Sequence, residues 1–216
     1  VSRMKSLIIN EIFYSIQGET SRSGLPTYFI RLTGCPLRCT YCDTGYAFNT
    51  GSKMSFEEIL SKLNRNTTKY ITITGGEPLS QKNVQSLMKE LCDLKYSVSL
   101  ETSNAITIED VDSRVSIILD IKTPGSQESD KNLISNYSKL KKSDELKFVI
   151  CNQNDFEWAI DYIKNHNLSS ICPIVFSPSY NQMPLSELAD LILKNSLHVR
   201  LQTQLHKTIW GEVNGK

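Results

Sequence analysis

Short runs of β-branched, aromatic and aliphatic residues recur along the chain at intervals that leave room for a helix or a loop between them. The runs are Tyr28–Leu32, Tyr70–Thr74, Tyr96–Leu100, Val115–Ile121, Glu145–Ile150, Ile171–Phe176 and His198–Gln204. This alternation is typical of a parallel sheet built from βα units. The pattern therefore predicts an α/β fold.

Amphipathic segments fill several of the intervals. Ser55 and Glu58 have the spacing of a capping box, and apolar residues at helical spacing follow them. The other predicted helices begin near Val84, at Asn154 and at Ser186. In contrast, residues 126–143 are polar, and we expect a mobile crossover there.

Roughly six βα units fit into the chain, fewer than the eight of a closed barrel. We therefore expect residues 1–216 to form a single domain with an incomplete, open (βα)6-type barrel. The active site of such a fold lies at the carboxyl ends of the strands. Glycine- and proline-containing turns follow three of the predicted strands, at Gly75–Pro78, Thr123–Gly125 and Ser177–Ser179.

Composition narrows the classes of function. The chain has 216 residues, 39% of them hydrophobic, which is enough for one buried core. Its 24 basic and 23 acidic residues give a net charge of +1, so we expect no nucleic-acid partner. The apolar runs are too short to cross a bilayer, and the first residues lack the features of a signal peptide. We expect a cytoplasmic enzyme with no membrane partner.

The six cysteines divide into two groups. Three lie within eight residues, and Cys92, Cys151 and Cys172 are scattered among apolar neighbours. Three disulfides are an alternative, but a domain of this size does not need them. We interpret the scattered cysteines as small core residues.

The clustered group, Cys35, Cys39 and Cys42, has a spacing that can bring three thiolates to one face of an iron-sulfur cluster. Three protein ligands on a four-iron cluster leave one iron open. The alternative is zinc, which normally takes a fourth ligand at recognisable spacing. No second Cys-x2-Cys or His-x3-His pair is present in the sequence. The triplet therefore favours a cluster.

With the aromatic Tyr41 before its last cysteine, the triplet resembles the motif of the radical S-adenosylmethionine (radical SAM) superfamily. The resemblance implies a [4Fe-4S] cluster whose open iron binds the amino and carboxylate groups of S-adenosylmethionine. Gly75–Pro78 resembles the second motif of the superfamily, which receives the methionyl ammonium. Its simpler interpretation is a tight turn, with Glu77 favoured by the dipole of a following helix.

A narrower resemblance covers nearly the whole chain. The matching segments are Glu11–Glu19, Phe29–Cys35, Cys42–Thr44, Ile73–Pro78, Leu100–Ser103, Asp120–Lys122, Phe176–Pro178 and Gln204–Lys207. Together they are similar to the 7-carboxy-7-deazaguanine synthase family. The resemblance implies a carbon–nitrogen lyase of queuosine and deazapurine biosynthesis, which converts 6-carboxy-5,6,7,8-tetrahydropterin to 7-carboxy-7-deazaguanine with loss of ammonia. It further implies a reducing electron donor such as flavodoxin or ferredoxin, and a homodimer.

The resemblance also assigns residues to the pterin. Arg31 lies at a strand end, and its guanidinium matches a substrate carboxylate. The alternative is a salt bridge from Arg31 to Glu11 or Glu19. The side-chain amide of Gln17 offers both a donor and an acceptor to the edge of a pterin. The alternative is that Gln17 and Gly18 simply form a turn. The residues assigned to the substrate are Arg31, Ile16, Gln17, Gly18 and Thr74.

A third set concerns S-adenosylmethionine and magnesium. The residues that the resemblance places on S-adenosylmethionine are Tyr41, Cys42, Asp43, Gly76, Glu77, Ser103, Lys122 and Ser177. A lysine that ends an apolar strand either reaches solvent or meets an anion, and we prefer the anion for Lys122. Thr44 occupies the position of the Mg2+ ligand of the family, whereas without the family it is a loop residue.

Two features depart from the family pattern. Asp120–Lys122 stands where Ser-Pro-Lys is commoner, so only Lys122 carries over. Many members end soon after the His-Lys pair and use their terminal residue on the substrate, whereas this chain continues past Lys207. We expect Trp210 or the backbone near it in that place. An activating enzyme that installs a glycyl radical and a non-catalytic zinc module remain as alternatives.

Overall fold

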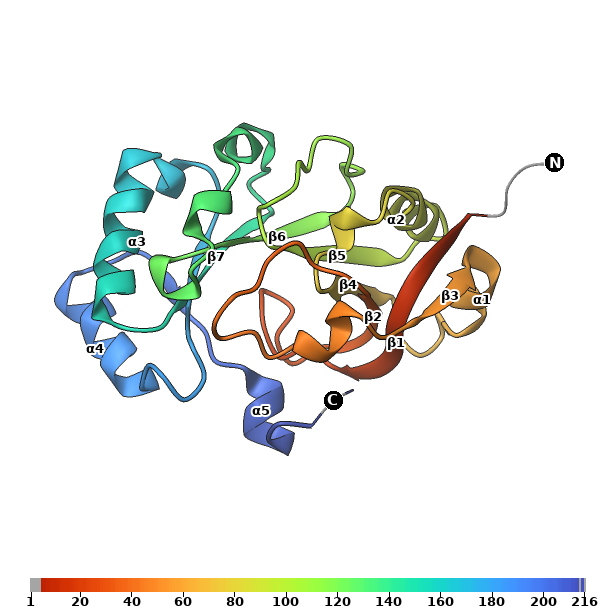
Figure 1. Ribbon diagram of the computed structural model, residues 1–216, viewed down its shortest axis with the longest axis horizontal. Helices are drawn as coiled ribbons and strands as arrows, with labels where there is room; N and C mark the ends of the chain where they lie inside the picture. The colour runs from red at the N-terminus through yellow and green to blue at the C-terminus, as the bar shows by residue number, and fades with distance from the viewer. Residues whose placement is uncertain (1–4, 214, 216) are drawn as a thin grey trace.

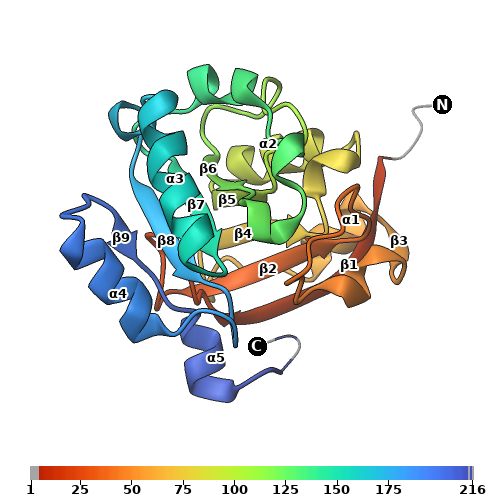
Figure 2. The same cartoon turned by 60° about the vertical axis from the view of Figure 1, so that its left-hand side comes forward.

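The computed structural model describes residues 5–213 and 215. Across these residues the strands form one nine-stranded sheet in the order β3-β1-β2-β4-β5-β6-β7-β8-β9 (Figure 1 labels β1 to β7, and Figure 2 also labels β8 and β9). Strands β2 and β4 to β9 are parallel, and β1 and β3 are antiparallel to their neighbours. Their bounds are β1 Ser6–Ile16, β2 Pro26–Leu32, β3 Ser52–Ser55, β4 Tyr70–Gly75, β5 Ser97–Thr102, β6 Ser116–Ile121, β7 Glu145–Ile150, β8 Ile174–Pro178 and β9 Arg200–Leu201. The prediction of a mainly parallel α/β sheet is confirmed.

The antiparallel edge is the part of the sheet that the hydrophobic pattern does not predict. In β1, Asn10 and Glu11 interrupt the apolar alternation, and the register against β2 shifts between Ile9 and Glu11. Strand β8 begins at Ile174, later than the expected Ile171, because the predicted run includes Pro173, which cannot donate to a ladder.

Five α-helices are present among the described residues, at α1 Phe56–Ser61, α2 Val84–Asp93, α3 Gln153–Asn165, α4 Leu185–Lys194 and α5 Leu205–Trp210. The capping box of Ser55 and Glu58 opens α1 as predicted. The predicted start at Asn154 is wrong, because Asn152 caps α3 through a bond from the backbone N–H of Asp155. The start at Ser186 is also wrong, because α4 begins at Leu185 after the N-cap Pro184.

The connection from β6 to β7 contains no α-helix. Three short 3-10 helices form it instead, η3 Pro124–Ser126, η4 Ser129–Lys131 and η5 Ile134–Lys139. Asn136 and Tyr137 of this connection are buried against the rest of the fold, so the expected polar crossover is anchored by its own side chains.

The sheet curves into an open barrel, as Figure 2 shows, with α2, α3 and α4 on its outer side. Strands β3 and β9 end the strand order and do not pair with each other, so the barrel stays open across the described residues and that prediction is confirmed. The core lies between the sheet and these helices. Cys92, Cys151 and Cys172 are buried in this part of the protein and unpaired, as predicted.

The loop between β1 and β2 closes one end of the barrel. Arg22 donates to the carbonyl oxygen of Ser97 at 2.9 Å and to the hydroxyl of Ser116 at 3.4 Å. The N–H of Ser21 donates to the Glu145 carboxylate at 2.8 Å. Since Ser97, Ser116 and Glu145 are the first residues of β5, β6 and β7, this plug loop covers the amino-terminal end of the parallel strands. No helix among residues 5–213 is long and apolar enough to cross a membrane.

Candidate active site

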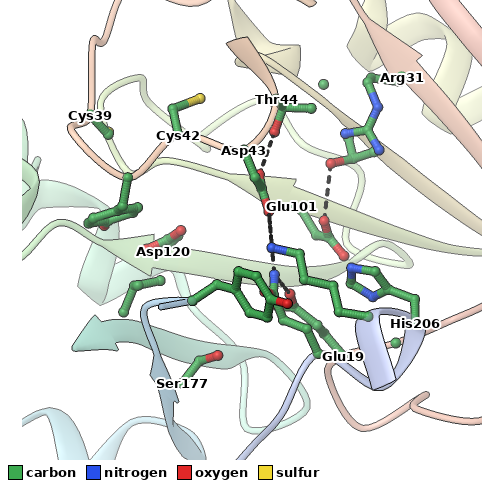
Figure 3. A pocket seen from close by; sticks show the side chains of 18 of the residues that line it. Glu19, Arg31, Cys39, Cys42, Asp43, Thr44, Glu101, Asp120, Ser177 and His206 are labelled. Atoms are coloured by element: carbon green, nitrogen blue, oxygen red, sulfur yellow. Dashed lines mark hydrogen bonds and ion pairs between the residues drawn. The ribbon is translucent and has the colours of Figure 1, made fainter. Parts of the chain in front are cut away.

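A cavity of about 330 Å³ lies inside the barrel, between Gln17, Gly18 and Glu19 at the start of the plug loop and the carboxyl ends of the strands. The loop after β2, the carboxyl ends of the strands and the chain after β9 line it. The predicted site residues on its wall are Ile16, Gln17, Gly18, Arg31, Cys35, Cys39, Tyr41, Cys42, Asp43, Thr44, Thr74, Gly76, Ser103, Lys122 and Ser177. Figure 3 shows Cys39, Cys42 and Asp120 on one side of the cavity and Arg31, Glu101 and His206 on the other.

The cysteine loop, residues 33–44, places three unpaired thiols on the cavity wall. The backbone N–H of Leu37 donates to the sulfur of Cys35 at 3.4 Å. Burial raises the pKa of Cys39 to about 11 and also raises the pKa of Cys35, so a metal must displace the protons of these thiols. Among the described residues, no three His, Cys, Asp or Glu side chains are placed to hold a single metal ion. A four-iron cluster instead offers a separate iron to each thiol.

The turn after β4 packs tightly against the cysteine loop. The N–H of Glu77 donates to the carbonyl oxygen of Gly34 at 2.8 Å. A Cβ atom at Gly76 would lie 2.3 Å from that same oxygen and 2.8 Å from the Cβ of Cys35, so only glycine fits. This close approach brings the backbone of the turn beside the first cysteine.

Glu77 is the one predicted site residue that the structure does not place on the cavity wall. Its carboxylate is fully buried and accepts bonds from the Thr102 hydroxyl at 2.9 Å and from both the N–H and the hydroxyl of Ser103, at 2.7 and 2.6 Å. These bonds leave it turned away from the cavity. Glu77 thus positions Ser103, which lines the cavity.

Lys122 reaches the cavity as part of an ion pair. Its ammonium lies 3.0 Å from Oδ2 of Asp120, and it faces the ring of Tyr41 at 5.8 Å. Burial would lower the pKa of Lys122, but Asp120 raises it well above the ordinary value. In the described part of the chain, Oδ1 of Asp120 and the hydroxyl of Tyr41 are buried with no hydrogen-bond partner. Both residues line the cavity.

Arg31 forms a salt bridge and also lines the cavity, so both roles considered for it are compatible with the structure. Its Nε donates to Oε1 of Glu11 at 2.7 Å, and the hydroxyl of Tyr46 donates to the same oxygen at 2.9 Å. The alternative salt bridge to Glu11 is therefore present, while Arg31 still lines the cavity. Glu11 and Tyr46 together fix the plane of the guanidinium.

Glu101, to which sequence reasoning gave no role, lies on the wall beside the predicted substrate residues. It accepts bonds from Nε2 of Gln17 at 3.3 Å and from the hydroxyl of Thr74 at 3.0 Å. Burial and the nearby charge of Glu19 raise the pKa of Glu101. The signal in the sequence was a carboxylate at the end of an apolar strand, where burial is costly without a partner.

Glu19 and Lys147 form an ion pair inside the cavity. Nε2 of Gln204 donates to the Glu19 carboxylate at 2.9 Å. Burial opposes the charge of Glu19, but Lys147 and Gln204 lower its pKa below the ordinary value. The pair joins the end of β1 to β7 and to the chain after β9, which no local pattern in the sequence predicts.

Helix α5 folds back over the cavity. The N–H of Leu205 donates to the carbonyl oxygen of Gly18 at 3.0 Å, and a Cβ atom at Gly18 would lie 2.0 Å from Nδ1 of His206. After Lys207, the residues Gly211, Glu212, Val213 and Gly215 line the cavity, and Trp210 is not among its lining residues.

Lys207 of α5 also meets the cysteine loop. Its ammonium lies 3.1 Å from Oδ2 of Asp43, and the hydroxyl of Thr44 donates to Oδ1 of Asp43 at 2.9 Å. Burial would raise the pKa of Asp43, but Lys207 and Thr44 lower it to about 2. An ionised carboxylate and a hydroxyl therefore stand side by side, a set of hard oxygen donors.

Comparisons with known proteins agree with this geometry. The sequence profile of the Radical SAM superfamily matches residues 29–192. The 7-carboxy-7-deazaguanine synthase of Chlorobaculum tepidum is 41% identical over 95% of this chain and 94% of its own length. The protein of the same name from Koribacter versatilis is 37% identical over 94% of this chain and 96% of its own length. The crystal structure of QueE from Escherichia coli superposes with a TM-score of 0.75 at 23% identity, covering 93% of this chain and 95% of that one.

Proposed function

The chain belongs to the 7-carboxy-7-deazaguanine synthase family of the radical SAM superfamily, and we propose that its barrel cavity converts 6-carboxy-5,6,7,8-tetrahydropterin to 7-carboxy-7-deazaguanine with loss of ammonia. One observation carries the proposal. A single cavity joins three free thiols to a set of groups that complements a pterin carboxylate and a pterin edge.

The residues present fit a [4Fe-4S] cluster and S-adenosylmethionine. Three thiols that form no disulfide line the wall beside the Gly76 turn, and Oδ1 of Asp120 and the Tyr41 hydroxyl have no hydrogen-bond partner among the described residues. When bound, these groups supply the radical that removes a hydrogen atom from the substrate. We assign Cys35, Cys39 and Cys42 to the cluster.

The S-adenosylmethionine subsite is assigned to the wall next to the cysteines. Gly76 offers the backbone of its turn to the methionyl end, and Ser103, Lys122 and Ser177 offer polar atoms to the ribose and the carboxylate. Tyr41 and Asp43 lie on the adenine side. Glu77 acts through Ser103, whose N–H and hydroxyl it holds.

The substrate end has complementary chemistry. The terminal nitrogens of Arg31 match a carboxylate, because Glu11 occupies only its Nε. Gln17 and Thr74 lie around Glu101, and together they present donors and acceptors to the N–H and carbonyl edge of the pterin. The Gly18 backbone and the Ile16 side chain complete this wall.

We propose that Mg2+ binds Thr44 and the substrate carboxylate. The low pKa of Asp43 keeps a negative charge beside the Thr44 hydroxyl at neutral pH. For the hydroxyl to become a ligand, it turns its proton toward Asp43, which is the direction that the structure already shows. The chain's part is to hold the pterin in one orientation, since an error of about 1 Å costs roughly a hundredfold in rate.

The resemblance to the family also underlies our proposals for the compartment, the oligomeric state and the electron donor. We propose that it works in the cytoplasm as a homodimer and receives electrons from a flavodoxin or a ferredoxin.

Anaerobic turnover with the reconstituted enzyme, S-adenosylmethionine and the carboxytetrahydropterin tests the proposal. Mass spectrometry should detect 7-carboxy-7-deazaguanine in excess over 5′-deoxyadenosine, because loss of ammonia alone is redox-neutral and the abstracted hydrogen atom has to be returned. A protein that binds zinc on the triplet, shows no charge-transfer absorbance and makes neither product would be a metal-binding module instead. Cleavage of S-adenosylmethionine only in the presence of a partner protein would support a glycyl-radical activating enzyme.

A further inference from the structure

The crossover from β6 to β7 contacts the cysteine loop on both sides of Cys39. The backbone N–H of Thr40 donates to the carbonyl oxygen of Ser126 at 3.2 Å, and the Thr40 hydroxyl donates to that of Gly125 at 2.7 Å. The N–H of Arg38 donates to the Glu128 carboxylate. These three bonds join segments that are more than eighty residues apart.

The same stretch, Gly125–Glu128, is held firmly from behind. The N–H of Gly125 donates to Oδ1 of Asp155 at 2.7 Å, and Asp155 is 1% exposed in the first turn of α3. A Cβ atom at Gly125 would lie 2.4 Å from Oδ2 of Asp155, so the backbone lies directly against that carboxylate. The Glu128 N–H bonds to the Ser126 hydroxyl at 3.1 Å, which orders the turn itself.

The crossover is tied to the S-adenosylmethionine side as well. The amide of Asn132 accepts from the N–H of Lys122 at 3.0 Å and donates to its carbonyl oxygen at 2.8 Å. The amide of Asn136 donates to that of Asn104 at 2.9 Å, next to Ser103. One segment therefore bonds to the backbone of the cysteine loop, to the backbone of Lys122 and to the side chain of Asn104, the residue after Ser103.

We propose that Gly125–Glu128 is a clamp for the cysteine loop, with Thr40 and Glu128 as positioning residues that hold Cys39 in the geometry of the cluster and in register with Ser103 and Lys122. None of the clamp residues contributes a cluster ligand. Preorganisation of this kind lowers the entropy cost of gathering three ligands around a metal group. The inference rests on the cluster site proposed above.

The test is the rate at which the reconstituted, anaerobic enzyme loses iron to a chelator. Thr40→Val keeps the branched shape and removes the donor, and Thr40→Ser keeps the donor. We expect iron loss to become about threefold to tenfold faster in Thr40→Val, the equivalent of one hydrogen bond, and to stay near wild type in Thr40→Ser. Thr67→Val, in the exposed loop between α1 and β4, is the matched control and should change nothing.

Glu128→Ala and Glu128→Gln give an independent comparison, because glutamine retains an acceptor for the Arg38 N–H. Iron loss should accelerate in the alanine variant and recover in the glutamine variant, with the same melting temperature in all variants. The electron paramagnetic resonance signal of the reduced cluster should also respond less sharply to S-adenosylmethionine in Thr40→Val. Equal iron loss in Thr40→Val, Glu128→Ala and Thr67→Val would overturn the clamp. A wild-type protein that takes up no cluster would instead overturn the proposed function.

Discussion

Replacing Lys147 by methionine should leave a buried carboxylate without its cation. Lys147 pairs with Glu19 in the cavity, and their side chains are only 15% and 12% exposed. Methionine fills a similar volume and removes the charge. Glu19 would then keep the amide donor Gln204 and the nearby His206, with Glu101 close enough to repel it.

The size of the effect follows from burial. Breaking a buried ion pair by removing one partner costs about 3–5 kcal/mol, much of it the penalty for the charge left behind. An attraction of about 4 kcal/mol between charges 4 Å apart at an effective dielectric constant of 20 gives the same scale. Because both side chains retain some contact with solvent, we expect the free energy of unfolding to fall by about 3 kcal/mol at neutral pH.

The destabilisation caused by Lys147→Met should depend on pH in a defined direction. In the wild type the pKa of Glu19 is lowered, so its contribution is present above the ordinary carboxyl range and is lost as the pH falls through the lowered value. The pKa of Lys147 is raised, so its contribution is present throughout the neutral range. Without Lys147, burial raises the pKa of Glu19 instead. The destabilisation should therefore be largest at high pH and shrink as Glu19 takes up a proton.

Anaerobic urea unfolding at about pH 8 and about pH 6 measures this difference. The double variant Glu19→Gln/Lys147→Met is the control, because a neutral pair carries no unpaired charge and should recover most of the lost stability. A destabilisation equal at both pH values, or equal in the single and double variants, would mean that packing and not charge explains the loss.

Three further predictions concern the site itself. Cys39→Ala should lose the iron and sulfide of the cluster, whereas Cys151→Ala should retain both; equal loss on metal analysis would contradict the assignment. Arg31→Lys keeps the charge but not the bidentate fork, so the dissociation constant of the pterin should rise by about tenfold with S-adenosylmethionine binding unchanged, and the reverse pattern in calorimetry would move Arg31 to the cofactor. Thr44→Val should lower turnover and raise the magnesium requirement with the cluster intact; identical magnesium curves for both proteins would leave Thr44 as a loop residue.

The sequence predicts those parts of the fold that depend on local pattern. The strand Glu145–Ile150 agrees with the structure at both ends, because its apolar run is bounded by polar turns. The start of α3 is misplaced because Asn152 and Asn154 are both good caps, and only the packing of the helix decides between them. Strand β1 is missed because Asn10 and Glu11 interrupt its alternation.

The sequence likewise predicts the site residues that lie close together along the chain and misses those that only the fold brings together. The three cysteines lie within eight residues, so their spacing alone puts them on one loop of the cavity wall. Glu101, Asp120 and Lys147 lie on three different strands, and the register and curvature of the sheet decide that all three face the cavity. His206 reaches it only because the chain folds back after β9. Long-range geometry of this kind leaves no local signal.

The plug loop between β1 and β2 makes the barrel a chamber with a floor. Arg22 bonds that floor to Ser97 and Ser116, so we expect substrate, cofactor and products to pass through the opposite end. Molecules that share a single entrance leave in the reverse order of their arrival. The ligand that binds second blocks the dissociation of the ligand that bound first. Steady-state kinetics should consequently follow an ordered scheme, in which the ligand that binds last has to dissociate before the ligand that bound first.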